Sequence, residues 1–187
     1  MVFMCEARAP ILIVAGPSGV GKSTVSRLVA AEIGERTSHL RIDDFTQCVV
    51  NGWVEPWLPE SSHQNEVLGG AVVAAAMQFV DGGYTVVVDG DVFPDSLEEL
   101  AQACRLREVP LHYAILRSDL GTCLERATSR NTGEGPDLAR FADLHARFDE
   151  LGERERNVVE ATGTPDEVAR AVLAAFHSGT LAETAPV

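Results

Sequence analysis

The residues with the clearest chemical potential form one short run near the start of the chain. Residues 16–23 read Gly-Pro-Ser-Gly-Val-Gly-Lys-Ser, which satisfies the spacing G-x-x-x-x-G-K-[ST] in full. Glycines at these positions let backbone N–H groups turn toward a bound phosphate chain. Lys22 then neutralises phosphate charge, and the hydroxyl of Ser23 is suited to ligating Mg²⁺. The motif predicts a site for a nucleoside triphosphate with magnesium.

The phosphate site also contains the only lysine of the chain. Lys and Arg together number 15, and all of them except Lys22 are arginines. A chain that otherwise avoids lysine therefore keeps one where the motif requires it. We expect ATP to be held by the loop and by the start of the helix that follows, that is, by Gly16, Pro17, Ser18, Gly19, Val20, Gly21, Lys22, Ser23 and Thr24.

A carboxylate suited to the metal ion follows a second apolar run. Tyr-Thr-Val-Val-Val at residues 84–88 leads directly into Asp89. Mg²⁺ prefers oxygen ligands and is commonly held by one or two carboxylates together with phosphate oxygens. We expect Asp89 to ligate the ion with Ser23, directly or through water. Asp91 shares the side of Asp89 if the strand continues.

Strand-like and helical segments alternate around these residues. Apolar runs indicate five strands, at 10–15, 38–42, 84–89, 110–116 and 157–160. Periodicity and capping residues indicate helices at 22–34, 66–80, after Pro94, at 119–130, from 137 to about 151, and from Thr164. This alternation predicts an α/β fold in which helices cover both faces of a parallel sheet. We expect one domain over residues 1–187, with a tail that frays from about residue 178.

Composition and charge limit the kinds of partner and the cellular compartment that we expect for this protein. The formal net charge is −13, which disfavours nucleic acid and anionic membranes, because both are bound through cationic surfaces. The four cysteines are far apart in the sequence, which indicates neither a disulfide framework nor a zinc site. No apolar run is long enough for a transmembrane helix or a secretory signal. We expect a cytoplasmic protein.

The reaction class follows by elimination among proteins with this phosphate loop. A chain without a second lysine has no N-K-x-D motif with which GTPase switches recognise their base. Motor ATPases need a longer chain. The remaining small class is the phosphotransferases, in which the second strand ends near a carboxylate that binds the acceptor. Asp43, in the run 41–45, is the candidate.

Several motifs together resemble a known fold family. The loop at 16–23, the Ile-Asp-Asp step at 42–44, the Val-Asp-Gly strand end at 88–90 and the Arg126-x-x-x-Arg130 spacing are similar to the nucleoside-monophosphate-kinase-like proteins. Within that fold, the chain resembles the small-molecule kinases and phosphotransferases grouped around gluconate, shikimate and chloramphenicol. The stretch 49–57 matches V-V-x-G-[YW]-x-x-P-W, which resembles gluconate-kinase-like bacterial proteins.

The resemblance implies a P-loop NTPase three-layer sandwich, with five parallel strands in the order 2-3-1-4-5 and a lid at about 131–137. It implies that Asp43 binds the acceptor and takes its hydroxyl proton. It also implies that Arg126 and Arg130 form a lid-hinge pair, one flanking the adenine and the other reaching the phosphates. Preorganised cations stabilise charge on the transferring phosphoryl group. The candidate catalytic residues are therefore Asp43, Lys22, Arg126 and Arg130, with Arg140 as a weaker addition.

The acceptor class is predicted from what residues 43–90 lack. This segment contains no Lys or Arg, although an acceptor with a phosphate or carboxylate needs cations in a closed site. Only the lid arginines, or Arg105 and Arg107, could reach in from elsewhere. The segment does offer aromatic faces and nearby acids, which suit a neutral or cationic alcohol. The candidate acceptor-binding residues are Asp43, Phe45, Trp53 and Trp57.

We therefore expect transfer of the γ-phosphate of ATP to a hydroxyl of a small metabolite or antibiotic. A nucleoside, nucleotide or gluconate-type kinase stays open, and so does a non-catalytic module that senses ATP. Trp53 and Trp57 are equally consistent with packing of a turn. The sequence indicates neither the identity of the acceptor nor the oligomeric state.

Overall fold

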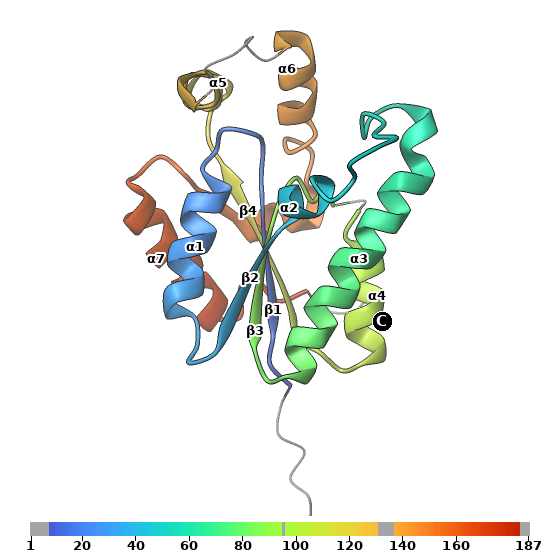
Figure 1. Ribbon diagram of the computed structural model, residues 1–187. Helices are drawn as coiled ribbons and strands as arrows, with labels where there is room; N and C mark the ends of the chain where they lie inside the picture. Colours follow the sequence, from blue (N-terminus) through green and yellow to red (C-terminus); the bar gives the residue numbers. More distant parts are fainter. Residues whose placement is uncertain (1–7, 95, 131–136, 184–187) are drawn as a thin grey trace, which may run out of the picture.

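A computed structural model of the chain describes residues 8–94, 96–130 and 137–183 (Figure 1). Five strands form one sheet, namely β1 (Ile11–Ala15), β2 (Thr37–Arg41), β3 (Thr85–Asp89), β4 (Leu111–Arg117) and β5 (Val158–Glu160). Every neighbouring pair is parallel, and the strand order is β2-β3-β1-β4-β5. The α/β class and the strand order expected from the sequence are both confirmed.

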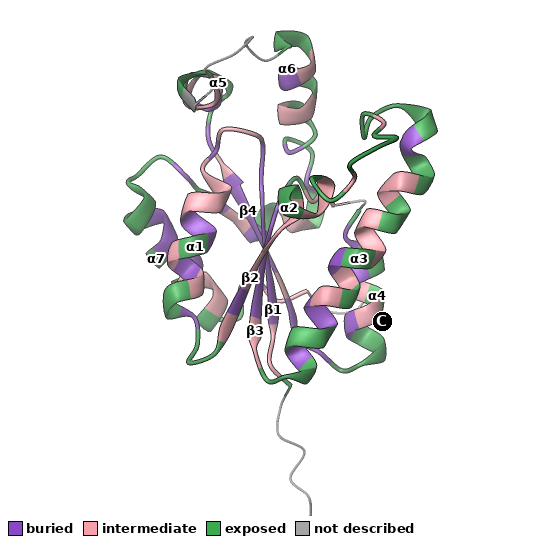
Figure 2. Ribbon diagram, viewed as in Figure 1, coloured by how far each residue is buried: buried purple, intermediate pink, exposed green. Residues whose placement is uncertain are grey.

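Helices pack on both faces of the sheet. One face carries α1 (Lys22–Glu32) and α7 (Pro165–His177), and the other carries α3 (Ser62–Asp81) and α4 (Glu98–Leu106) (Figure 1). Along β1, Ile11 and Ile13 join the core beneath α3 and α4, while Leu12 and Val14 join the core beneath α1 and α7. A strand buried on both faces needs a continuous apolar run rather than an alternating one. Figure 2 shows the resulting buried strands between helices whose outer surfaces are exposed.

The remaining helical segments lie in the connections between strands. They are α2 (Ile42–Thr46), the short 3₁₀ helix η1 (Pro59–Ser61), α5 (Leu120–Arg130), α6 (Leu138–Ala146) and the 3₁₀ helix η2 (Gly152–Asn157). Figure 1 shows α5 and α6 rising above the sheet, separate from the first turns of α3. The expected lid at 131–137 falls outside the described residues except for its last position. Within the described ranges, no helix is both long and apolar enough to cross a bilayer.

Three helices differ from the sequence expectation, and the capping box expected for a fourth is present. The helix α2 was not expected, α3 begins at Ser62 rather than at 66, and α6 ends at Ala146 rather than near residue 151. The chain leaves α6 because Phe148 stacks on Phe93, with 4.9 Å between ring centroids, and Leu151 turns into the same core. The capping box expected at Thr164 is present at the start of α7.

The sequence predicts a tail that frays from about residue 178, and this prediction is wrong for the residues up to Glu183. Leu181 is fully buried, and its carbonyl accepts a hydrogen bond from the amide of Tyr113 at 2.9 Å. Ala182 forms an isolated bridge with His112, and the amide of Glu183 donates to the carbonyl of Leu111. These contacts tie the segment to β4, because its backbone groups and one large apolar side chain find partners there. Residues 184–187 lie outside the described part of the chain.

Replacing Leu181 by Ala should lower the free energy of unfolding by about 2–5 kcal/mol, as expected for truncating a fully buried leucine. Leu106→Ala is the matched control, because Leu106 is 79% exposed and buries little surface. Urea denaturation followed by circular dichroism measures both. Equal stability of the two variants would mean that the segment through residue 183 does not contribute to the core.

Candidate active site

The phosphate loop packs closely against the neighbouring backbone. A Cβ at Gly19 would lie 2.0 Å from the carbonyl oxygen of Cys123 on α5, and one at Gly16 would lie 2.5 Å from that of Leu116 on β4. Both glycines also have a positive φ, +82° and +142°, in the region that side chains disfavour. The loop is therefore seated directly against β4 and α5. The first amides of α1, which have no acceptor within the helix, follow immediately at Lys22.

Lys22 is held by the loop and by one carboxylate. Its Nζ donates to the carbonyl oxygens of Gly16 at 2.9 Å and of Pro17 at 3.1 Å. The same nitrogen lies 2.7 Å from Oδ1 of Asp91, and the lysine side chain is only 11% exposed. The ammonium is therefore partnered within the protein. A phosphate would have to replace Asp91 as its anionic partner.

Asp89 connects β3 to the start of α1. Its side chain is buried, and Oδ1 accepts a hydrogen bond from Oγ of Ser23 at 3.1 Å. The two oxygens meet because Asp89 is in register with Val14, near the end of β1. Hydroxyl and carboxylate oxygens are the donors that Mg²⁺ prefers, so the pair fits the ion. In the described residues, no three His, Cys, Asp or Glu side chains form a metal site, and further ligands would come from phosphate and water.

His39 is a site residue that the sequence analysis missed. Its Nε2 lies 2.5 Å from Oδ2 of Asp89, so both carboxylate oxygens of Asp89 have a partner. His39 is two residues before Arg41, which is in register with Asp89. Alternation along β2 therefore puts His39 on the face of Asp89. The alternation of side chains along β2 can be deduced from the sequence, but the contact with Asp89 also depends on the pairing of β2 with β3.

Close packing of α2 on the end of β3 brings Asp43 to the carboxyl edge of the sheet. Ile42 opens α2, and a Cβ at Gly90 would lie within 2.9 Å of three Ile42 side-chain atoms. Glycine at position 90 therefore lets α2 pack directly on the end of β3. This places Asp43 in the first turn of α2, beside Asp44, which pairs with Arg41 at 3.3 Å.

The surroundings of Asp43 raise the pKa of its carboxyl, although the residue itself remains exposed to solvent. Burial raises the pKa of this carboxyl, and the carboxylates of Asp91 and Asp89 raise it further. Lys22 and Arg41 act in the opposite direction, but their effect is smaller. A carboxyl with a raised pKa accepts a proton more readily, which suits a general base.

The structure describes the side chain of only one of the two arginines expected at the lid hinge. Nη1 of Arg126 donates to the carbonyl oxygens of Val20 at 3.3 Å and of Ala161 at 3.4 Å. Its guanidinium therefore lies between the phosphate loop and the connection after β5. Arg130 is the last residue of α5, and its side chain is outside the described structure. The proposed catalytic roles of both arginines remain predictions.

The expected acceptor-binding aromatics have different environments. Phe45 is half-buried and packs against the core beneath α3 and α4. Trp53 and Trp57 are exposed, by 39% and 49%. The guanidinium of Arg140, on α6, lies over the ring of Trp57. This contact joins two segments that are distant in the sequence, so no local pattern predicts it.

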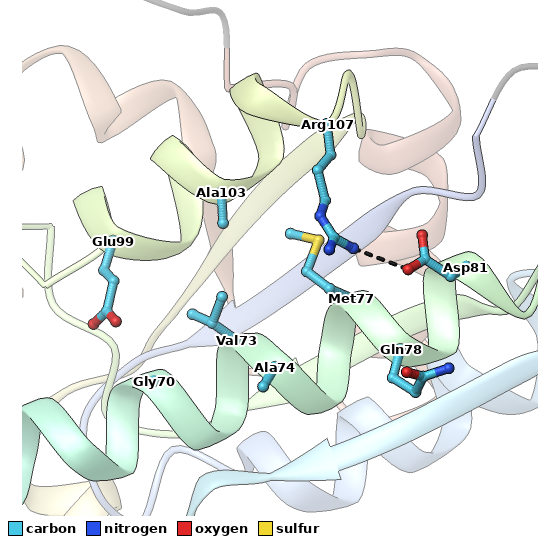
Figure 3. Close-up of a pocket in the computed structure, with 9 residues that line it drawn as sticks. All are labelled: Gly70, Val73, Ala74, Met77, Gln78, Asp81, Glu99, Ala103 and Arg107. Atoms are coloured by element: carbon cyan, nitrogen blue, oxygen red, sulfur yellow. Dashed lines mark hydrogen bonds and ion pairs between the residues drawn. The ribbon is translucent and has the colours of Figure 1, made fainter.

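A hollow of about 430 Å³ between α3 and α4 lies apart from these residues (Figure 3). Its wall is mainly apolar, with Val73, Met77 and Ala103, and an ion pair joins Arg107 to Asp81 at 2.9 Å. None of the predicted site residues lines it. Arg105 pairs with Glu98 on α4, so Arg105 and Arg107, which directly follows α4, both have carboxylate partners other than Asp43.

Comparison with known proteins identifies the fold family. The profile of the family described as AAA domain matches residues 11–151. No match was found among curated proteins. The matched region includes the phosphate loop at 16–23, Asp43 and Asp89.

Solved structures with the same fold cover most of the chain. A gluconokinase from Sinorhizobium meliloti aligns over 92% of this chain and 93% of its own, with a TM-score of 0.65 and 18% identity. The tunicamycin resistance protein of Deinococcus radiodurans aligns over 95% and 100%, with a TM-score of 0.64 and 18% identity. One chain of the Pnkp1/Rnl/Hen1 RNA repair complex aligns over 81% of this chain, with a TM-score of 0.65 and 16% identity, and this chain spans about half of it, 48%. At these identities, the likeness establishes the fold.

Asp91→Asn should increase the affinity for ATP measured without Mg²⁺ by about two- to fivefold, because it removes a partly exposed anion that competes for Lys22. Asp81→Asn is the matched control, since Asp81 is equally exposed, 42%, and also ion-paired, but lies at the end of α3. Titration calorimetry measures both. Unchanged or weaker binding by Asp91→Asn would contradict the competition.

Proposed function

The chain belongs to the AAA domain family, and from this premise we propose that it is an enzyme that transfers the γ-phosphate of ATP to a hydroxyl of a small molecule. The observation that carries the proposal is the convergence of Lys22, Ser23, Asp89 and Asp43 at one edge of the sheet. Kinases among the structurally similar proteins support the reaction class through the shared fold.

The donor side uses residues of the loop and of β3. Backbone amides around residues 16–23 would bind the phosphates at the N-terminus of α1. Lys22 would leave Asp91 for the β- and γ-phosphates, and Ser23 and Asp89 would hold Mg²⁺. When bound, the ion neutralises charge that develops on the phosphate oxygens. His39 keeps the Asp89 carboxylate in place through its second oxygen.

The acceptor side uses Asp43. The acceptor hydroxyl oxygen attacks the γ-phosphorus and forms a new P–O bond, while the bond to the β,γ-bridging oxygen breaks and ADP leaves. Asp43 takes the hydroxyl proton. Its raised pKa makes the carboxylate a better proton acceptor than an ordinary aspartate. Arg126, next to Val20, would add positive charge near the nucleotide.

The charges near Asp43 favour a neutral or cationic acceptor. Residues 43–90 contain no Lys or Arg. Arg41, the arginine whose charge acts on Asp43, pairs with Asp44, and Arg140 lies over Trp57. An acceptor with a phosphate or carboxylate would therefore have to break an existing contact to find a cation.

A screen for acceptors tests the function directly. The protein is incubated with ATP, Mg²⁺ and single compounds from a set of neutral, cationic and anionic alcohols, including nucleosides, nucleotides and gluconate. Mass spectrometry should show the gain of one phosphate on a neutral or cationic alcohol. Lys22→Ala should slow that transfer by about 10²-fold or more, because a preorganised cation is lost. ATP binding without transfer to any compound would instead indicate a module that senses ATP.

Asp43→Asn should abolish transfer and leave ATP affinity near the wild-type value, because the amide cannot accept the proton. Asp44→Asn is the matched control, since Asp44 is an exposed neighbour on the same helix. Turnover and ATP binding are measured separately on both variants. Wild-type turnover by Asp43→Asn would exclude Asp43 as the base.

The pH dependence provides an independent test of the same base. Transfer requires ionised Asp43, so its rate should fall as the pH drops through the pKa of this carboxyl. Because burial and neighbouring carboxylates raise that pKa, the acid limb of kcat/KM should lie at higher pH than for an ordinary aspartate. An acid limb at the pH typical of an ordinary aspartate would contradict the assignment of Asp43 as the base.

A further inference from the structure

We infer that Trp57 forms a subsite for the cationic group of the acceptor, and that Arg140 occupies this subsite when no acceptor is bound. The role in acceptor recognition rests on the proposed phosphotransferase function and narrows its substrate to amphipathic alcohols that carry an ammonium or guanidinium group. Cation recognition at the ring itself does not depend on catalysis.

The first observation is the contact between two distant parts of the chain. The guanidinium of Arg140 lies over the face of Trp57, although the two residues belong to α6 and to the segment before α3. Tryptophan is the aromatic side chain that attracts cations most strongly through its face. Trp57 nevertheless remains 49% exposed, so the Arg140 guanidinium covers part of the side chain and the rest is open to solvent.

The second observation is that the segment carrying Trp57 is held in place. Gln64, near the start of α3, accepts from the amide of Val54 at 2.9 Å and donates to its carbonyl at 2.7 Å. On the other side, the carbonyl of Pro56 accepts from Asn65 Nδ2 at 2.7 Å and from Ser61 Oγ at 2.9 Å. These side chains fix the backbone immediately before the ring. A ring held before binding loses little entropy when a ligand stacks on it.

The third observation is the charge around the contact. Carboxylates of Glu55, Asp137 and Asp143 act on the Arg140 guanidinium. Burial lowers the pKa of Arg140, while these carboxylates act to raise it. Burial has the larger effect, so the net shift is downward, and the carboxylates offset part of the cost of placing a cation over Trp57. An acceptor ammonium in the same place would meet the same carboxylates.

The fourth observation is that exposed apolar side chains are concentrated in the segments that carry Trp57 and Arg140 and at the start of α3. Most of the large exposed apolar side chains in the described residues belong to the Trp57 segment, the start of α3 or the start of α6. They are Val50, Trp53, Trp57, Leu58, Val67 and Leu138. An acceptor with apolar groups around its cation would cover this surface, whereas a small hydrophilic cation would not. This favours an amphipathic amine over a simple one.

These observations explain why Arg140 and an acceptor cation exclude one another. Both require the face of Trp57 and the same carboxylates, so Arg140 acts as an intramolecular competitor. Removing Arg140 should strengthen the binding of a cation. Had Arg140 instead held an anionic group of the acceptor, its removal would weaken binding of that anion and leave cations unaffected.

Choline and 3,3-dimethyl-1-butanol are the probes, because they share a shape and differ in charge. Binding is followed by the fluorescence of Trp57 in the full chain carrying Trp53→Phe, in which Trp57 is the only tryptophan. Choline should bind about tenfold more tightly than its neutral analogue, as expected for a partly desolvated cation–π contact. Trp57→Leu, with Trp53 as reporter, should lose the saturable response to choline.

Arg140→Ala, on the Trp53→Phe background, should bind choline several-fold more tightly and change binding of the neutral analogue much less. Arg147→Ala is the matched control, because Arg147 follows α6 directly and also lies over an aromatic ring, that of Phe93. It removes one positive charge without uncovering Trp57, and choline affinity should stay near that of the parent.

Equal affinity for choline and the neutral analogue would overturn the subsite, and so would weaker choline binding by Arg140→Ala. The same tightening in Arg147→Ala would also overturn it, because general electrostatics would then explain the effect. If charge discrimination is found but no alcohol is ever phosphorylated, the subsite stands and the proposed function fails. If neutral and cationic alcohols are phosphorylated equally well, the function stands and the subsite is wrong.

Discussion

The one ammonium at the carboxyl edge of the sheet must balance several carboxylates at once. Lys22 pairs directly with Asp91, and Asp43 experiences the charges of Asp91, Asp89 and Lys22 together. Like charges at short range raise the cost of ionisation, and a single cation offsets that cost only in part. The raised pKa of Asp43 reflects this imbalance. A phosphate chain in the loop would add further negative charge, which a divalent ion and arginines from the neighbouring helices would offset.

Parallel strand pairing is what gathers these groups. Each strand of the sheet ends at the same edge, and β1, β2 and β3 are neighbours in the order β2-β3-β1. The chain then leaves β1 toward the face of α1 and leaves β3 toward the face of α4, so the two connections diverge at neighbouring strand ends. The phosphate loop follows one of these strands, and Asp89 ends the other. The α2 helix closes against β3 because Gly90 leaves room for Ile42.

The parts of the site that the sequence predicted are those carried by local motifs. Lys22 and Ser23 belong to one contiguous motif, and Asp89 ends a recognisable apolar strand, so their shared location needed only a parallel sheet. His39 was missed because its partner is on another strand, and the register between them is not written in either segment. The tail and the end of α6 were misjudged for a related reason. Leu181 and Phe148 find their partners on β4 and after β3, far away in the sequence.

By itself, the sequence determined that this chain is an α/β protein with a phosphate loop, five strands and an acidic, aromatic segment after the second strand. Periodicity, glycine spacing and charge are local properties, and each can be counted along the chain. Only the tertiary structure decided that His39 supports Asp89, that Asp91 holds Lys22, and that Arg140 lies over Trp57. Each of these is an encounter between segments that are distant in sequence, and its geometry is set by packing rather than by either segment alone.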